Sequence, residues 1–210
     1  PTGTTIGKYL WPSAGAFQDA GARCSTNDPD EQEIANTLKI VQDWKMRRSN
    51  TRRLDILRVP LYVHLIQSKT AKNVVSDVQV QDQVDVLNEA FSPEIQFSLK
   101  NVTRSDNEDW YVCELGGNEK AMKHALWTGG SDSLNLYLCV PGEGLLGWST
   151  LPSRYEVNPI YDGVVVHAES IPGGRLAPYN LGNTATHEIG HWFGLFHTFQ
   201  VRLLHTLLPC

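Results

Sequence analysis

The spacing of apolar residues along the chain predicts an alternation of strands and helices. A stripe that ends at Phe91 has helical spacing and follows a capping box formed by Ser76 and Gln79, and a shorter helix is expected over Glu119–Trp127. Runs of branched and apolar residues predict strands at Ile56–Ile66, Ile95–Val102, Leu134–Val140 and Gly163–Ala168. This rhythm favours an α/β fold in which helices pack against a mixed, largely parallel sheet.

The first quarter of the chain has a different character. Residues 1–27 show little periodicity, so we expect them to be irregular. A helix then follows, for which we predict Asp28 as N-cap, a capping box closed by Glu31, and an end near Arg48. The polar stretch beyond it predicts a domain boundary and a cleavage site at two dibasic pairs, Arg47-Arg48 and Arg52-Arg53.

Composition narrows the class of protein. The chain has 210 residues, of which 41% are hydrophobic and 20% are charged, as in one globular domain or in one domain with a small appendage. A net charge of −5 and the lack of a long basic cluster argue against binding to nucleic acid. The longest apolar run, Leu57–Ile66, is interrupted by polar residues and is too short to cross a bilayer, so no membrane span is predicted.

Cysteines and a glycosylation sequon favour secretion. The cysteines are even in number, and Asn101-Val102-Thr103 matches the sequon, whereas an export signal would have to precede Pro1. The alternative is that the sequon is accidental and the cysteines are buried thiols, as the apolar surroundings of Cys139 would allow. The four cysteines are Cys24, Cys113, Cys139 and Cys210.

A glycine-rich segment, Gly142–Gly147, matches the G-x-G-x-x-G pattern of nucleotide-binding loops. The residues after it include Trp148 and Pro152 and do not begin a helix, so no phosphate would meet a helix N-terminus. We interpret the segment as a turn into an edge strand, to which an extended peptide substrate could add by backbone pairing.

The residues that carry chemistry stand near the C-terminus, in the pattern H-E-x-x-H-x-x-G-x-x-H. His187 and His191 lie one helical turn apart and can bind one metal ion, and a turn at Gly194 brings His197 to complete a three-nitrogen set. Three ligands leave a fourth position for water, which is typical of a catalytic zinc. Glu188 lies beside the metal face and is predicted to be the general base rather than a ligand.

Chance does not account for this pattern, which would occur in about 3 of 100,000 sequences of this composition. The alternative reading is that the three histidines are core or surface residues without a metal. The remaining histidines stand outside any such pattern and are expected to be ordinary strand, helix or tail residues: His64, His124, His167 and His205.

With this zinc-helix pattern the chain resembles the metzincin metalloproteases. The segments Tyr179–Gly182 and Thr184–Glu188 before and within the zinc helix, and His197–Gln200 after it, narrow the resemblance to the pappalysin family and its secreted fungal extracellular metalloproteases. Two upstream segments also resemble that family: Val86–Phe91 and Gly144–Gly147.

The resemblance implies a fold, an activity and a division of the chain. It implies a secreted, extracellular zinc endopeptidase that cleaves proteins or peptides, with an upper subdomain of a twisted mixed five-stranded sheet, a backing helix and the zinc helix. Residues 54–200 would form this catalytic part, residues 1–53 a prosegment, and residues 201–210 an aberrant or truncated tail. The methionine-containing turn and the lower subdomain of the family are not found after Gln200. The competing interpretation is therefore an inactive zinc-binding fragment or pseudo-protease.

The resemblance also implies latency. In this group a cysteine of the prosegment occupies the open position of the zinc, and Cys24 is the candidate here, although Ser25 replaces the usual glycine after it. The alternative is a disulfide bond between Cys24 and another cysteine.

Overall fold

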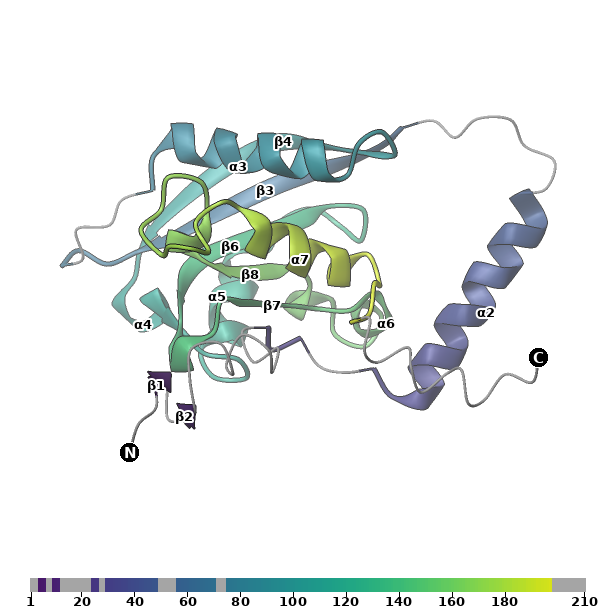
Figure 1. The fold of residues 1–210 in the computed structure, drawn as a ribbon, viewed down its shortest axis with the longest axis horizontal. Helices are drawn as coiled ribbons and strands as arrows, with labels where there is room; N and C mark the ends of the chain where they lie inside the picture. The colour runs from purple at the N-terminus through teal and green to yellow at the C-terminus, as the bar shows by residue number, and fades with distance from the viewer. Residues whose placement is uncertain are drawn as a thin grey trace.

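A computed structural model describes residues 4–6, 9–11, 24–26, 29–48, 56–70 and 75–197. Helices and strands alternate along most of this range (Figure 1). The strands are β1 (Thr4–Ile6), β2 (Tyr9–Trp11), β3 (Leu57–Gln67), β4 (Ile95–Asp106), β5 (Val112–Cys113), β6 (Leu134–Pro141), β7 (Gly147–Ser149) and β8 (Val164–His167). The α-helices are α2 (Glu31–Arg48), α3 (Asp77–Ala90), α4 (Glu108–Tyr111), α5 (Glu119–Leu126), α6 (Pro152–Tyr155) and α7 (Asn183–Trp192). Short 3₁₀ turns are η1 (Gly142–Gly144), η2 (Pro159–Tyr161) and η3 (Ala168–Ser170).

The main sheet has the order β4-β3-β6-β8-β7, with the short β5 paired to β6. Every pairing along this path is parallel except the last, in which β7 runs antiparallel to β8. The predicted α/β class with a mixed, largely parallel sheet is therefore confirmed. The five strands of the path match the expected number, and β5 is an addition.

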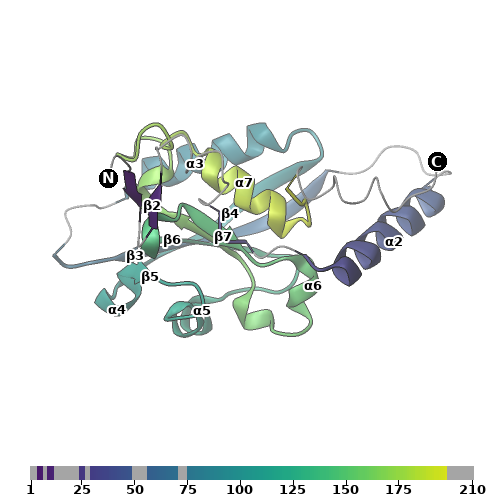
Figure 2. The same ribbon diagram turned by 60° about the horizontal axis from the view of Figure 1, so that its bottom comes forward.

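Helices cover both faces of the sheet, so the fold has three layers (Figure 2). Alternate side chains of β6 point to opposite faces, as the pleat of a strand requires. Leu136 and Leu138 join α3 and α7 in one core, whereas Tyr137 and Cys139 join Met122 of α5 in the other. Because the sheet is buried on both sides, its central strands are almost uniformly apolar, and the position of α7 is fixed against a rigid surface.

The structure confirms one predicted helix cap and corrects another. At α3 the Ser76 hydroxyl accepts from the Gln79 N–H, and the Gln79 side-chain oxygen accepts from the Ser76 N–H. At α2 the capping box is formed by Asp30 and Glu33, two residues later than predicted: Asp30 Oδ1 accepts from Glu33 N at 2.8 Å. Glu33 also bonds to Arg154 on α6 at 3.0 Å, a contact that favours this register.

One further expectation was wrong. Residues 1–27 were predicted to be irregular, yet β1 and β2 pair in antiparallel orientation within them.

For two of the cysteines the structure decides between the readings of the sequence. Cys139 forms a disulfide bond with Cys113, so the alternative that it is a buried thiol is excluded. The parallel pairing of β5 with β6 brings these two cysteines together. Cys24 carries the one free thiol among the described residues.

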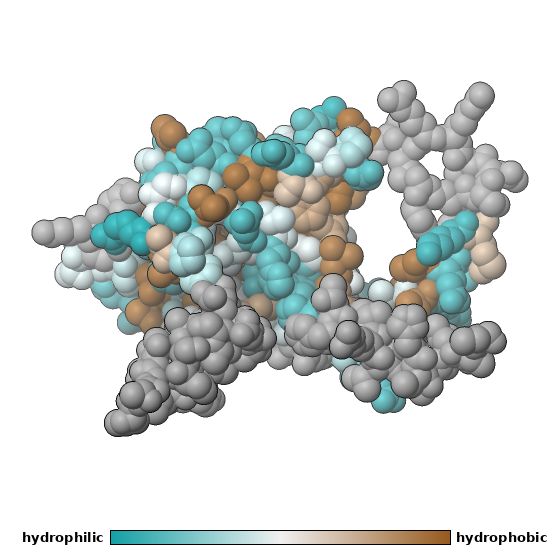
Figure 3. Space-filling view, viewed as in Figure 1, coloured by the Kyte–Doolittle hydropathy of each residue, from teal (hydrophilic) through white to brown (hydrophobic). Residues whose placement is uncertain are grey.

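No helix in the described residues is both long and apolar enough to cross a bilayer. Scattered apolar side chains are exposed on α2, among them Ile40 at 68%, and they appear as brown patches in Figure 3. Isolated exposed apolar residues are normal on protein surfaces.

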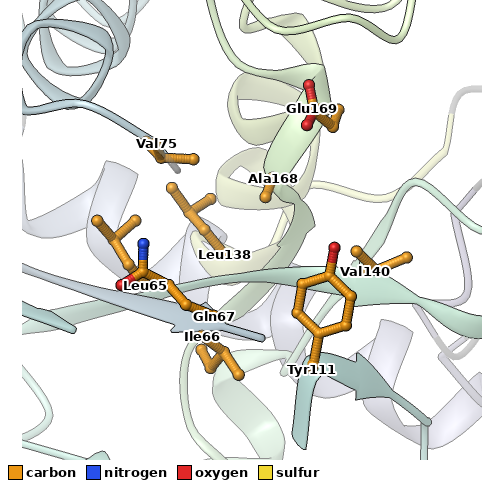
Figure 4. A pocket seen from close by; sticks show the side chains of 9 residues that line it. All are labelled: Leu65, Ile66, Gln67, Val75, Tyr111, Leu138, Val140, Ala168 and Glu169. Carbon is orange, nitrogen blue, oxygen red and sulfur yellow. The ribbon is translucent and has the colours of Figure 1, made fainter. Parts of the chain in front are cut away.

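A crevice lies at the carboxyl ends of β3, β6 and β8, where Gln67, Tyr111 and Glu169 line it among apolar side chains (Figure 4). Its volume of about 10 Å³ has room for one water molecule at most. Glu169 is paired with Arg175 at 2.9 Å. The crevice is therefore a packing feature rather than a ligand site.

Candidate metal centre

The predicted histidine cluster is assembled by one helix and the turn that ends it. His187 and His191 project from the same face of α7, and their Nε2 atoms are 3.1 Å apart. After α7, Gly194 adopts a left-handed conformation with φ of 88°, and Leu195 N–H donates to Gly190 O at 2.9 Å. This turn brings His197 back toward the helix, with its Nε2 atom 3.1 Å from that of His191.

The donor set fits a tetrahedral metal ion. Nitrogen atoms bound to zinc at 2.0–2.1 Å lie about 3.4 Å apart in a tetrahedron, close to the spacings of this cluster. His191 Nδ1 donates to the carbonyl of Leu195 at 2.6 Å, so the lone pair of this ring is on Nε2, which faces the cluster. Desolvation and the two neighbouring histidines lower the pKa of His187 to about 4, which keeps that ring in the neutral form that binds metals.

Cys24 completes the cluster from the other end of the chain. Its Sγ atom and one nitrogen from each of the three histidines all lie within 4.8 Å of one another. Burial, and then the neighbouring Glu188 carboxyl, raises the pKa of the Cys24 thiol to about 12. The thiol donates to Glu188 Oε2 at 3.3 Å. Thiolate and imidazole together are a donor set that zinc prefers.

Glu188 lies deep in the site and is not a member of the ligand cluster. It is 1% exposed, and its Oε2 atom also accepts from the Thr26 hydroxyl at 2.8 Å. Burial raises the pKa of Glu188 to about 7, while the bonds from Thr26 and Cys24 oppose this shift. A carboxyl group with a pKa near neutrality can both accept and release a proton at physiological pH.

The segment Cys24–Thr26 lies along the open edge of β7. Cys24 forms a parallel bridge with Gly147, and Ser25 N–H donates to Gly147 O at 3.1 Å. Ser149 N–H donates to the Thr26 hydroxyl at 2.8 Å. The predicted edge strand is thus present, and part of this chain already occupies it.

Sequence reasoning missed two residues of this centre. Thr26 stands two residues after Cys24 without any motif of its own. Gly147 was noticed only as part of a glycine-rich turn, but a Cβ atom there would lie 2.6 Å from Val165 O and 3.1 Å from the Cγ atom of Glu188. The close approach of β7 to α7 therefore requires a glycine.

The other described histidines lie outside the cluster. His64 is buried, with Nε2 donating to Asn135 Oδ1 at 2.9 Å and Nδ1 accepting from the Thr103 hydroxyl at 2.8 Å. His167 Nδ1 accepts from the backbone N–H of Glu169 at 3.0 Å. His124 lies in the last turn of α5. His205, and the expected tail at 201–210, lie outside the described residues.

Two grooves flank the short helix α6. One, of about 460 Å³, runs beside β7 and is lined by Ser149 and Arg154 among others. The second, of about 610 Å³, is lined by Trp192 and Phe193 at the end of α7. Both are large enough to receive side chains of a bound peptide.

Sequence comparison finds close relatives among fungal proteins. An extracellular metalloprotease of Verticillium alfalfae is 37% identical over 204 residues, a match that covers 92% of this chain and 73% of the relative. The chain spans 65% and 66% of the length of two further fungal extracellular metalloproteases that it matches. No model of a known protein family matches the sequence.

Solved structures agree with this match. Mature mirolysin of Tannerella forsythia in complex with a cleaved peptide has a TM-score of 0.59 and 26% identity, over 69% of this chain and 66% of that chain. A mutant of promirolysin from the same organism has a TM-score of 0.61 and 25% identity. That match covers 83% of this chain and 69% of the promirolysin chain.

Proposed function

Because this chain belongs to the fungal extracellular metalloproteases, a metzincin family, we propose that it is a secreted zinc endopeptidase. The observation that carries the proposal is the convergence of three imidazole nitrogens, with 3.1 Å separations from His191 to each of its neighbours, beside a buried glutamate. The ligands are His187, His191 and His197, and the general base is Glu188.

The three histidines would hold Zn²⁺, which when bound supplies a Lewis acid that polarises water and the carbonyl of the scissile peptide bond. The carbonyl of Leu195 orients the His191 ring for this purpose. Glu188 accepts a proton from water at a carboxylate oxygen and later donates it to the leaving amine. The pKa of about 7 for this carboxyl group suits both steps at neutral pH.

The edge of β7 is the proposed binding site for the substrate backbone. An extended peptide would bond to Gly147 O and Ser149 N–H, two groups that Ser25 and Thr26 engage here. The mirolysin structure with a cleaved peptide supports peptide substrates for this kind of fold. Proteins or peptides are therefore the proposed substrates.

The N-terminal residues 1–53 are proposed to be a prosegment, with residues 54–200 as the catalytic part. In the latent form the Cys24 thiolate would take the fourth position at the metal and exclude water. Two observations support this: Cys24 belongs to the histidine cluster, and the promirolysin match covers 83% of this chain whereas the mature mirolysin match covers 69%. Secretion is supported by the Cys113–Cys139 disulfide, since such bonds persist in oxidising compartments.

The test measures zinc content and peptide hydrolysis in a Cys24→Ala background, which removes the latency contact. The wild-type site should bind one zinc per chain by elemental analysis. Glu188→Gln should retain zinc and lose hydrolysis by a factor of about 10² to 10⁴, because general acid-base catalysis contributes this much. Glu89→Gln, an exposed change on α3, is the matched control and should leave both unchanged.

Each other outcome has a distinct meaning. Unchanged hydrolysis in Glu188→Gln with zinc retained would refute the role of Glu188. Stoichiometric zinc without hydrolysis, both in the Cys24→Ala chain and after proteolytic removal of residues 1–53, would favour the competing interpretation, an inactive zinc-binding fragment. A chain without zinc would overturn the metal site.

A further inference from the structure

Thr26 contacts two groups that the proposed reaction needs. Its hydroxyl donates to Glu188 Oε2 at 2.8 Å and accepts from Ser149 N–H at 2.8 Å. The residue is 8% exposed, so these bonds are largely screened from water. A hydroxyl has one hydrogen to donate and lone pairs to accept with, and both are used here.

The backbone of the segment places this hydroxyl and the thiol on the same side. In an extended strand, residues two apart point to the same face. Cys24 and Thr26 therefore both face α7, the thiol toward the histidine cluster and the hydroxyl toward the general base. Ser25 lies between them and contributes its backbone N–H to Gly147.

We propose that Thr26 is a second inhibitory contact, which holds the Glu188 carboxylate and covers the substrate-binding amide of Ser149 while Cys24 covers the metal. The inference rests on the proposed function and adds a residue to the proposed latency of that site. The segment then blocks three elements of the reaction at once: the metal, the general base and the edge strand.

The hydrogen bond from Thr26 to Glu188 should account for most of the inhibition by Thr26. Hydrogen bonds to charged groups are stronger than those between neutral groups, and Glu188 is buried where water cannot replace a lost donor. In the zinc-loaded form the Cys24 thiolate would have no proton to donate, so without the Thr26 hydroxyl Glu188 Oε2 would keep neither of the side-chain donors observed here. Loss of the hydroxyl should therefore raise the fraction of chains in which the segment has left β7 and the histidine cluster.

The experiment measures that fraction through the accessibility of Cys24. The rate at which the thiol reagent DTNB labels Cys24 is followed in the zinc-loaded full chain, with Cys210→Ser so that a single thiol reacts. Thr26→Val, which keeps the shape and removes the hydroxyl, should raise the rate about tenfold or more. Thr26→Ser, which retains the hydroxyl, should label like the wild type, and so should the matched control Ser25→Ala.

A double-mutant cycle separates the bond to Glu188 from the bond to Ser149 N–H. In a Glu188→Ala background, Thr26→Val should raise the labelling rate much less than in the wild type, because the charged acceptor is gone. An equal effect in both backgrounds would show that Thr26 only anchors the segment to β7, and it would overturn the role toward the base. Circular dichroism and zinc content monitor folding, and Thr26→Ala serves if Thr26→Val folds poorly.

Failure of this inference differs from failure of the proposed function. If zinc binds and Thr26→Val labels at the wild-type rate, the second inhibitory contact does not exist, while the zinc endopeptidase proposal stands. If the wild-type chain binds no zinc, the proposed function itself is refuted, whatever the labelling rates are.

Discussion

At the scale of single residues, Gly147 shows how closely β7 and α7 approach. Its backbone accepts from Ser25, and its missing Cβ atom leaves room for the Glu188 side chain and for Val165 O. Another glycine, Gly190, lies within α7 itself, but a Cβ atom there would meet only Leu195, at an ordinary 3.5 Å. A side chain is therefore excluded at Gly147 but would fit at Gly190.

Substitution of these glycines tests that difference. Gly147→Ala should destabilise the chain by about 1–3 kcal/mol through overpacking and should reduce hydrolysis, because the added methyl group displaces Glu188. Gly190→Ala should be tolerated or should stabilise by up to about 1 kcal/mol, since alanine favours a helix. Thermal unfolding and peptide hydrolysis measure both effects. Equal tolerance of the two changes would contradict the close approach.

His64 predicts a dependence of stability on pH. Burial lowers the pKa of His64, although its bond with Asn135 opposes this. Because the folded state prefers the neutral ring, the unfolded state binds more protons once the pH falls below about 6.5. The stabilisation is therefore complete above about pH 6.5 and is lost progressively as the pH falls toward the lower pKa of the folded state.

The comparison of wild type with His64→Gln isolates this residue from the other histidines. Urea unfolding midpoints should decline more steeply below about pH 6.5 in the wild type than in the variant. Parallel declines would show that His64 does not contribute to the pH dependence.

At the scale of elements, a buried polar network joins α5 to β7. Glu119 Oε1 accepts from Trp148 Nε1 at 2.7 Å and from Lys123 Nζ at 2.9 Å. Lys123 is 0% exposed and also donates to the carbonyl of Tyr161 at 2.6 Å. Burial lowers the pKa of Lys123, and the nearby Glu119 opposes that shift. The edge strand is thus fixed to the helix layer behind it.

Removal of one charge from this pair should be costly. Glu119→Gln leaves the Lys123 ammonium buried without its carboxylate and should lower the free energy of unfolding by about 3–5 kcal/mol. Glu114→Gln, an exposed change just before α5, should stay within about 0.5 kcal/mol. Urea denaturation measures both, and a small effect of Glu119→Gln would mean that Lys123 is neutral in the folded state.

The elements also show which features local sequence could predict. The capping box at Ser76 and the turn at Gly194 depend on neighbours in the chain, and both were predicted correctly. At α2 the pattern D-x-x-E occurs twice, at Asp28 and at Asp30, and the distant partner Arg154 engages Glu33 of the second. Such a choice is made by tertiary contacts and cannot be read from the local pattern.

At the scale of the whole molecule, the disulfide and the candidate metal centre also show that contacts between chain neighbours can be predicted from the sequence and distant contacts cannot. The three histidines come from one helix and its final turn, so their spacing sufficed to predict that they would converge. The Cys113–Cys139 pair depends on the register of β5 against β6, and the position of Cys24 and Thr26 depends on contacts more than 120 residues away along the chain. These long-range contacts have no signature in the local sequence.

The disulfide makes a measurable prediction for the stability of the whole chain. It closes a loop with a sequence separation of 26, for which the chain-entropy model gives about 3.5 kcal/mol. Replacement of Cys113 and Cys139 together by alanine should lower the free energy of unfolding by about this amount in urea denaturation. Glu114→Gln, the exposed change described above, is the control. A loss under about 1 kcal/mol would show that the bond contributes little.

The coverage of β7 has a consequence for storage of the protein at high concentration. An open strand edge is a template onto which another molecule can add, and aggregation often begins there. In this chain β7 is the last strand of the sheet, and the side of β7 that faces away from β8 is covered by the bridge between Cys24 and Gly147. The residues proposed to inhibit the reaction therefore also cover the strand edge at which self-association would begin.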